Sequence, residues 1–374
     1  MTSSFNKEEC ISNAALITGK KELSELPHYV TANDFLSRLS PDELSGIRSK
    51  MIKTLIRKRS FEKARFLGKY WMVIIDATQL HTSKKPIDDQ CLTQTFTNKE
   101  TGETHTRYYH SVLEAKIVLG EGFVVSIASE FIENEGEDAD GQKKRSAEEI
   151  KQDCEIKAFQ RLATKLKKEF QRLPICILGD SLYASESVFK TCDENQWKYL
   201  FRFKDGRIPT ISSEFHVLKK REDQNQKDGV KWVNGISYNK RMVNVLEFKC
   251  KQKEKELEFQ WITNLEITKS KVLKFVEAGR KRWMIENEGF NTQKNLRYEI
   301  THANSKNYTA FKNHYILTQI ADILLQLYEK GTPIIKELNK TIKNISSDLL
   351  ASFGQQLTKE DILDTKRRTS LSIP

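Results

Sequence analysis

Two short apolar runs, each closed by an aspartate, constrain the fold of this chain more than any other feature. One run is Trp71–Asp76, WMVIID, and the other is Ile175–Asp180, ICILGD. A nearly continuous apolar segment of this length is typical of a strand that is buried on both faces of a sheet. Such strands need helices to cover them, so the two runs predict a mixed α/β fold.

The segments around the two runs supply further strands and the covering helices. Alternating apolar residues predict strands at about 108–119 and 122–132, joined as a hairpin. A four-residue apolar repeat then predicts one long amphipathic helix that ends before Pro174. A helix near 184–195 and a strand at 197–203 follow the second run. These elements together predict a mixed sheet with flanking helices.

The hydrophobic pattern of the sequence changes over residues 205–263. Apolar and polar residues alternate there, which predicts a β-rich insertion with its own sheet. Helical periodicity resumes near residue 269, and a further amphipathic helix is expected over 308–329. The tail after residue 331 is mixed in pattern and has no predicted role.

The charge of the chain indicates the class of its partner. It carries 62 Lys and Arg against 51 Asp and Glu, a formal net charge of +11. This excess favours nucleic acid, because cationic side chains that neutralise phosphates release counterions. A helix is predicted to begin at Ser40–Glu43 and to run into the late fifties. Its end carries Arg57, Lys58 and Arg59 as candidate phosphate contacts, and a solvated helix face is the equally weighted alternative.

The cysteines and histidines indicate no metal site by their spacing. No two of the six cysteines form a CxxC pair, and His81, His105 and His110 are spaced by 24 and 5 residues. Reduced thiols and ordinary histidines are therefore expected. No apolar run approaches the ~20 residues that span a bilayer, and Met1 is followed by polar residues. We expect an intracellular protein without a membrane partner.

The aspartates that close the two runs are candidate metal ligands. Phosphodiester cleavage uses hard oxygen ligands that converge on two Mg²⁺ ions ~4 Å apart. If the two predicted strands are neighbours in one sheet, Asp76 and Asp180 lie at the same edge and could share a metal, and a later helix carries a Glu. A turn-forming role is the alternative for either aspartate.

Four motifs resemble, in their order and context, those of one known family. They are Ile75-Asp76-Ala77-Thr78, Gly179-Asp180-Ser181-Leu182-Tyr183, Thr263-Asn264-Leu265, and Arg282-Trp283-Met284-Ile285-Glu286 followed by Lys294. Over roughly residues 70–325 the chain resembles the DDE transposases of bacterial insertion sequences, in the group that includes insertion sequence number four. The catalytic core of that family is retroviral-integrase-like, that is, ribonuclease H-like.

The resemblance implies a site and its cofactor. It gives the catalytic and metal-binding roles to Asp76, Asp180 and Glu286, with two Mg²⁺ ions as cofactors and Mn²⁺ as a substitute. Glu288 is the alternative to Glu286. Arg282 is implied to contact a DNA phosphate, and an internal salt bridge to a neighbouring acid is its alternative.

The helix that carries Glu286 departs from the family signature at two positions. The family Tyr falls at Gly279, and the family Lys falls at Gln293, one residue before Lys294. At 100° per residue, an α-helix puts Gln293 within ~20° of Glu286 and Lys294 ~80° away. Both side chains are therefore candidate DNA contacts. Gly289 predicts a bend within the helix.

Trp261 is a candidate platform for a DNA base. Enzymes of the resembled group often close a hairpin on the transposon end, which turns one base out of the stack, and an aromatic ring stabilises such a base by ~1–3 kcal/mol. Trp261 ends the last predicted strand of the insertion, 25 residues before Glu286. Core packing, with Phe259 on the same face, is the slightly favoured alternative.

The implied activity is that of an endonuclease and DNA-joining enzyme, which cleaves double-stranded DNA at transposon ends and transfers the strand into target DNA. A homodimer on DNA and a nucleoid-associated location in the bacterial cytoplasm are also implied. The implied segments are a helical basic N-terminal segment (1–66), the first part of a ribonuclease H-like core (67–204), a β-rich insertion (205–263), the second part of the core with the catalytic helix (264–330) and a C-terminal tail (331–374). The alternatives are another ribonuclease H-like nuclease, such as a junction resolvase, and a transposase-derived DNA-binding protein without catalysis.

Overall fold

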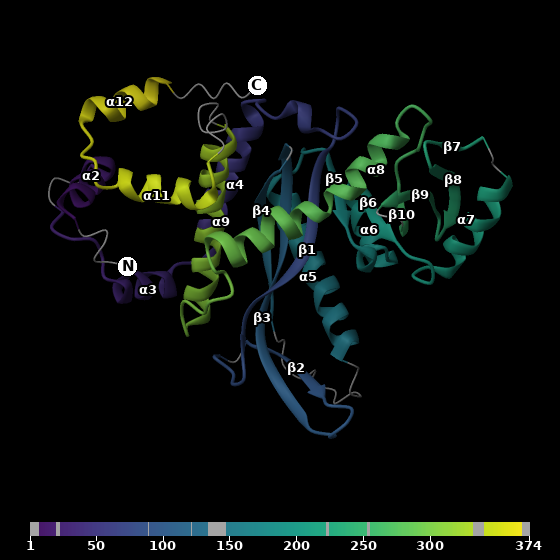
Figure 1. Cartoon of the computed structure of the whole chain (residues 1–374), viewed down its shortest axis with the longest axis horizontal. Helices are drawn as coiled ribbons and strands as arrows, with labels where there is room; N and C mark the ends of the chain where they lie inside the picture. The colour runs from purple at the N-terminus through teal and green to yellow at the C-terminus, as the bar shows by residue number, and fades with distance from the viewer. Residues whose placement is uncertain are drawn as a thin grey trace. The chain divides into compact units, whose positions relative to one another are not determined.

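The computed structural model divides the chain into two units (Figure 1). The structure describes residues 7–19, 23–88, 90–120, 122–133, 147–221, 224–252, 255–331 and 340–368. The first unit comprises Met1–Ser60, Leu296–Tyr298 and Ala303–Pro374, and the second comprises Phe61–Asn295 and Glu299–His302. Among the described helices, none has the length and apolar character needed to cross a membrane.

The second unit is built on one mixed sheet. Its described strands follow the order β2-β3-β1-β5-β6-β10-β9-β8-β7, with β4 paired to β3. The strands are β1 (Trp71–Ser83), β2 (Leu92–Thr97), β3 (Thr104–Gly120), β4 (Phe123–Ile132), β5 (Ile175–Gly179), β6 (Lys198–Phe203), β7 (Gln226–Lys227), β8 (Val230–Tyr238), β9 (Arg241–Gln252) and β10 (Lys255–Thr263). The helices are α5 (Ala147–Glu169), α6 (Glu186–Glu194), α7 (Pro209–Arg221) and α8 (Val272–Lys281), with short segments η1 (Glu62–Ala64), η2 (Ser181–Tyr183), η3 (Ile285–Asn291) and η4 (Gln293–Arg297).

The two apolar runs lie side by side in the middle of this sheet. β1 and β5 are parallel neighbours, with Trp71 beside Ile175 and Ile74 beside Leu178, and β6 is parallel to β5 on its other side. β3 and β4 continue the sheet in antiparallel pairs from β1. The first five residues of β1 and all of β5 are buried. The mixed sheet with flanking helices is confirmed, and its strand order is consistent with a ribonuclease H-like fold.

Residues 205–263 differ from the predicted insertion in two respects. Their strands do not form a separate sheet, because β10 pairs with β6, with Thr263 beside Leu200, and β9 and β8 follow in turn. This pairing covers backbone groups that the edge of β6 would otherwise present unpaired. In addition, Pro209–Arg221 form the helix α7. Its first residue is proline, whose missing N–H costs nothing at that position.

A two-stranded arm extends the hairpin that was predicted for β3 and β4. β3 begins at Thr104, earlier than predicted, and its first residues pair with β2 from Leu92 beside Tyr109 to Thr97 beside Thr104. Most residues near the tip of this pair are exposed. Figure 1 shows β2 and the start of β3 extending beyond the central strands. We call residues 92–109 the β2–β3 arm.

The first unit is helical and joins the two ends of the chain. Its described helices are α2 (Glu8–Thr18), α3 (Tyr29–Arg38), α4 (Pro41–Arg57), α9 (Tyr308–Gly331), α11 (Ile342–Ser352) and α12 (Lys359–Arg368). The side chain of Asn13 donates to the carbonyl of Gln355 and accepts from the N–H of Leu357, each at 2.8 Å. The C-terminal tail, which had no predicted role, therefore packs with the N-terminal helices.

The cationic end of α4 is exposed, as expected. α4 begins at Pro41, and the Ser40 hydroxyl accepts a hydrogen bond from the N–H of Asp42 at 3.4 Å. Arg57, Lys58 and Arg59 are all exposed at its other end. Arg48, in the first half of the helix, is only 2% exposed and belongs to the interior of the unit. Lys50, between Arg48 and the end of the helix, is exposed as well.

Candidate active site

Asp76 and Asp180 lie beside each other just past the point where the parallel pairing of β1 and β5 stops. β1 does not end at Asp76 but continues to Ser83 in its pairing with β3, whereas Asp180 directly follows β5. The parallel register of β1 and β5 ends with Ile74 beside Leu178. Two residues further along, the same register brings Asp76 beside Asp180. Neighbouring strands are about 4.8 Å apart, and residues in register point to the same face. The negative charge of Asp180 accordingly raises the pKa of Asp76.

Backbone N–H groups hold one oxygen of each aspartate. Asp76 Oδ1 accepts from Ala77 at 3.0 Å, and Asp180 Oδ1 accepts from Leu182 at 2.8 Å and so caps η2. Gly179 allows this turn to pack, because a Cβ at that position would lie 2.8 Å from the buried ring of Tyr183. In this pair, Gly179 therefore allows the close packing and Asp180 supplies the carboxylate.

Glu286 approaches Asp76 from the helical segment that follows α8. The guanidinium of Arg282 lies between Asp76 and Glu286, because its Nη1 lies 3.4 Å from Asp76 Oδ2 and its Nη2 lies 3.8 Å from Glu286 Oε2. The guanidinium carbon of Arg282 also lies 4.6 Å from the centre of the Trp283 ring. The internal salt bridge that was the alternative for Arg282 is therefore formed in this structure.

The electrostatics of the acids fit a divalent cation. Burial raises the pKa of Asp76 from 3.8 to about 6, Arg282 opposes this rise, and the charges of Asp180 and Glu286 add to it. Carboxylate oxygens are the ligands that Mg²⁺ and Mn²⁺ prefer. The side chain of Asp76 is 24% exposed and that of Glu286 is 51% exposed, so both can be reached from solvent. The donor set therefore fits the metal that the family implies.

Asp76→Asn is expected to stabilise the metal-free protein at neutral and alkaline pH. The folded state raises the pKa of Asp76 from 3.8 to about 6, so this group favours folding while protonated and loses that contribution as the pH rises through 6. Removing the charge should therefore add up to about 3 kcal/mol at about pH 8, at ~1.4 kcal/mol for each pKa unit. Thermal unfolding in a chelator measures the gain. It should shrink at about pH 4, and an equal gain at both pH values would exclude the charge as its cause.

The π-helical segments η3 and η4 change which residue faces the acids. Gln293 is completely buried, and its contact with DNA stays a prediction. Burial lowers the pKa of Lys294 and the charge of Asp76 raises it, so its ammonium lies on the side of the acids. A π-helix bonds residue i to i+5, which adds about one residue to each turn. That extra residue moves the position facing Glu286 from Gln293 towards Lys294.

Trp261 belongs to the core of the second unit. Its side chain is 2% exposed and stacks on Phe259 with ring centres 5.8 Å apart, so the two share a face as the alternative expected. A Cβ at Gly279 would lie 2.5 Å from Trp261 Nε1. The glycine therefore makes room for the indole at the position of the family Tyr. This burial favours the core-packing alternative, and the contact of Trp261 with a flipped base stays a prediction.

Two buried charged residues on β3, near the helical segment that carries Glu286, were not predicted. Glu114 lies beside Asp76 in the β1–β3 register, Lys116 follows two residues later, and both are 0% exposed. Ser129 donates a hydrogen bond to Glu114. A Cβ at Gly289 would lie 3.3 Å from methylene carbons of Lys116, so the glycine lets the helix approach β3. Two charges spaced by two residues within an apolar strand are the signal that could have found them, because buried charges need partners.

Comparison with known proteins gives an independent indication of the family. Residues 149–322 match the family model described as the transposase DDE domain. The matched segment contains Asp180, Arg282 and Glu286, and it begins after Asp76. A search of the curated proteins found no match. The family match supports a DDE transposase, in agreement with the motifs, and such a domain suggests DNA transposase activity on a DNA substrate.

Proposed function

We propose that this chain is the transposase of a bacterial insertion sequence, in the group that includes insertion sequence number four. It cleaves DNA at the ends of its element and joins the freed 3′-hydroxyl to target DNA. The observation that carries the proposal is that Asp180 lies beside Asp76 while Arg282 joins Asp76 to Glu286. The match of residues 149–322 to the transposase DDE domain supports the same activity.

The three acids have one role in this proposal. Asp76, Asp180 and Glu286 would hold two Mg²⁺ ions, for which Mn²⁺ can substitute, and the chemistry supplied there is activation of the attacking and leaving oxygens of a phosphodiester. Asp76 lies within β1 just past its parallel pairing with β5, and Asp180 directly follows β5. Each is fixed by a backbone hydrogen bond. Rigid support of this kind keeps ligands in position.

Arg282 and Lys294 position the DNA backbone. In the absence of a cation, Arg282 offsets the charges of Asp76 and Glu286. When the acids are neutralised, this attraction weakens, and the planar guanidinium can turn to a phosphate, which its paired donors suit. Lys294, whose ammonium lies near Asp76, provides a second positive charge for the same strand.

The proposal is tested by incubating the protein with the flanking end DNA of its element in Mg²⁺. Denaturing gels should show nicks at the element boundary, and native gels should show joined products when target DNA is added. Mn²⁺ should substitute for Mg²⁺, whereas Ca²⁺ should support binding better than cleavage. Preferred cleavage of a four-way junction would instead indicate a junction resolvase. Binding of end DNA without cleavage in either ion would indicate a DNA-binding protein that has lost catalysis.

We also propose that two copies of the chain act together on DNA. The support is the family resemblance, since two element ends are brought together during transposition. Molecular mass measured in solution, with and without end DNA, tests the assembly. A complex with two protein copies and two ends is expected, and a complex that always contains one copy would contradict the dimer.

The cationic end of α4 is expected to contribute to DNA affinity. Replacing Arg57, Lys58 and Arg59 together by glutamine should weaken binding to all sequences and lower the slope of log affinity against log salt by about one unit for each lost phosphate contact. All three side chains are exposed, so the melting temperature should not change. Fluorescence anisotropy over a salt series measures the slope. An unchanged slope would leave only the solvated helix face.

A further inference from the structure

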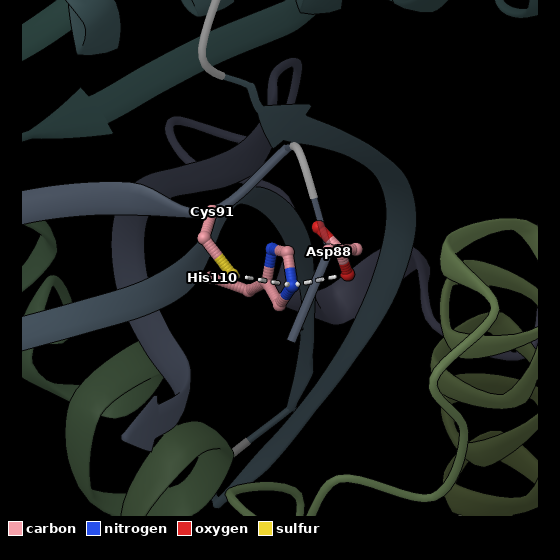
Figure 2. Close-up of side chains that lie close together, drawn as sticks. All are labelled: Asp88, Cys91 and His110. Carbon is pink, nitrogen blue, oxygen red and sulfur yellow. Dashed lines mark hydrogen bonds and ion pairs between the residues drawn. The ribbon is translucent and has the colours of Figure 1, made fainter. Parts of the chain in front are cut away.

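Three potential metal ligands meet at the base of the β2–β3 arm (Figure 2). Asp88 lies in the connection between β1 and β2, Cys91 immediately precedes β2, and His110 lies on β3. The β2–β3 register begins with Leu92 beside Tyr109, so one further residue brings Cys91 beside His110. One ligand atom from each of the three side chains lies within 4.8 Å of the other two.

The other two ligand atoms converge on a single nitrogen, Nε2 of His110. Asp88 Oδ2 lies 2.9 Å from it and Cys91 Sγ lies 3.5 Å from it, as Figure 2 shows. A ring nitrogen carries at most one hydrogen, so Nε2 can donate to only one of these atoms. If Nε2 instead accepts from the thiol, the Asp88 carboxylate faces its lone pair. A cation at this point would be attracted by all three atoms at once.

The ligand atoms are held in place by other contacts. Asp88 Oδ1 accepts a hydrogen bond from the N–H of Gln90 at 2.9 Å, which leaves Oδ2 turned towards His110. Cys91 is 4% exposed and His110 is 2% exposed, whereas the side chain of Asp88 is 15% exposed. Two ligands are thus shielded from water, and the third leaves a path from solvent.

We propose that Asp88, Cys91 and His110 form a Zn²⁺ site whose fourth position is open to water. Zinc binds thiolate at about 2.3 Å and nitrogen or carboxylate oxygen at about 2.0–2.2 Å, so ligand atoms in a tetrahedral site lie about 3.3–3.7 Å apart. The spacings of 2.9 and 3.5 Å around Nε2 require only small shifts to reach this geometry. Binding converts the Cys91 thiol to a thiolate and releases its proton to solvent. One thiolate and one carboxylate then balance the double charge of the ion, which lowers the cost of burying it.

This site differs from the three acids in the metal that it prefers. A thiolate with an imidazole favours Zn²⁺, whereas carboxylates alone favour Mg²⁺ and Mn²⁺. The two sites also occupy different positions on β3, because Glu114 is the residue beside Asp76 and His110 precedes it by four residues. The zinc proposal is therefore independent of the proposed DNA chemistry.

A bound zinc ion would stabilise the base of the β2–β3 arm against the sheet. The arm is a two-stranded ribbon, and such ribbons are marginally stable without further support. A metal held by Asp88 and Cys91 on one side and His110 on the other ties the β1–β2 connection to β3. Removal of zinc is therefore expected to loosen the arm while the central strands stay folded.

Cobalt spectroscopy tests the site directly. The full chain is stripped of metal with a chelator, kept in excess Mg²⁺ so that the acids are occupied, and titrated with Co²⁺, which replaces Zn²⁺ in tetrahedral sites. A thiolate-to-cobalt charge-transfer band that saturates at about one ion per chain is expected, and Zn²⁺ should displace it. The absence of this band in the wild type would overturn the proposal, whatever any variant does.

Single substitutions identify the ligands. Cys91→Ser should abolish the thiolate band, and Asp88→Asn should keep the band but weaken affinity by about tenfold or more. Cys250→Ser is the matched control, since Cys250 is half-buried on β9 and outside the cluster. A band that survives in Cys91→Ser, or disappears in Cys250→Ser, would contradict the assignment. Circular dichroism of each variant shows that the fold is retained.

Discussion

Each of the variants Asp76→Ala, Asp180→Ala and Glu286→Ala is expected to cut end DNA at least about 10³-fold more slowly than the wild type. A lost metal ligand removes several kcal/mol of transition-state stabilisation. The side chains of Asp76 and Glu286 are 24% and 51% exposed, so truncating them should leave the core intact. Product formation on denaturing gels gives the rate, and fluorescence anisotropy should show that DNA binding is largely retained.

Glu288→Ala is the control for this series. Glu288 lies two residues from Glu286 and is exposed, and Glu286 is the residue that pairs with Arg282. The control should therefore cut at the wild-type rate. Normal cleavage by Glu286→Ala together with loss of cleavage in Glu288→Ala would mean that the wrong glutamate has been assigned.

Trp261→Ala is expected to destabilise the protein by about 3–5 kcal/mol, which is typical of a buried Trp replaced by Ala. The indole is 2% exposed, stacks on Phe259 and lies against Gly279. Nicking and hairpin formation on end DNA should fall together, because the loss comes from the core. Denaturant unfolding and gel assays of the same preparation measure both effects. Gly279→Ala, which crowds the same indole, should cost about 1–3 kcal/mol.

A different outcome would restore the DNA role of Trp261. If Trp261→Ala lost the hairpin product while nicking and the unfolding free energy stayed at wild-type values, the indole would have to reach the DNA. Burial in the structure without DNA would then describe a state that changes on binding.

The meeting of Asp76 and Asp180 could be predicted in part, because the position of each acid depends on local pattern. Each acid follows an apolar run long enough for one buried strand, and parallel neighbours bring their carboxyl ends to one edge. That the two strands are neighbours, with Ile74 beside Leu178, had to come from the structure. Their role as metal ligands stays a prediction until the variants are measured.

That Lys294 rather than Gln293 faces the acids could not be predicted from periodicity. Apolar spacing indicates a helix but does not show whether its hydrogen bonds close at i+4 or i+5, and the π-helical segments depend on tertiary packing. One contributor is Gly289, whose missing Cβ lets the helix lie close to Lys116. Sequence spacing alone therefore predicted both Gln293, which is buried, and Lys294, which faces the acids.

The cluster of Asp88, Cys91 and His110 could not be predicted from the sequence, because it also depends on tertiary structure. Cys91 and His110 are 19 residues apart and share no recognised zinc spacing. Only the register of β2 and β3, a strand pair that begins outside the predicted hairpin, brings them together. Their separation in the sequence led to the expectation of ordinary side chains.

We propose that the acids bind the metal directly, and the metal preference of Asp180→Cys tests this ligation. A thiolate binds Mg²⁺ poorly and accepts Mn²⁺ more readily, so replacing a true ligand should change which ion supports cleavage. The expected result is a variant that is inactive on end DNA in Mg²⁺ and regains measurable cleavage in Mn²⁺, while the wild type cuts in both. A variant that cuts equally well in the two ions, or that stays inactive in both while still folded and binding DNA, would contradict direct ligation by Asp180.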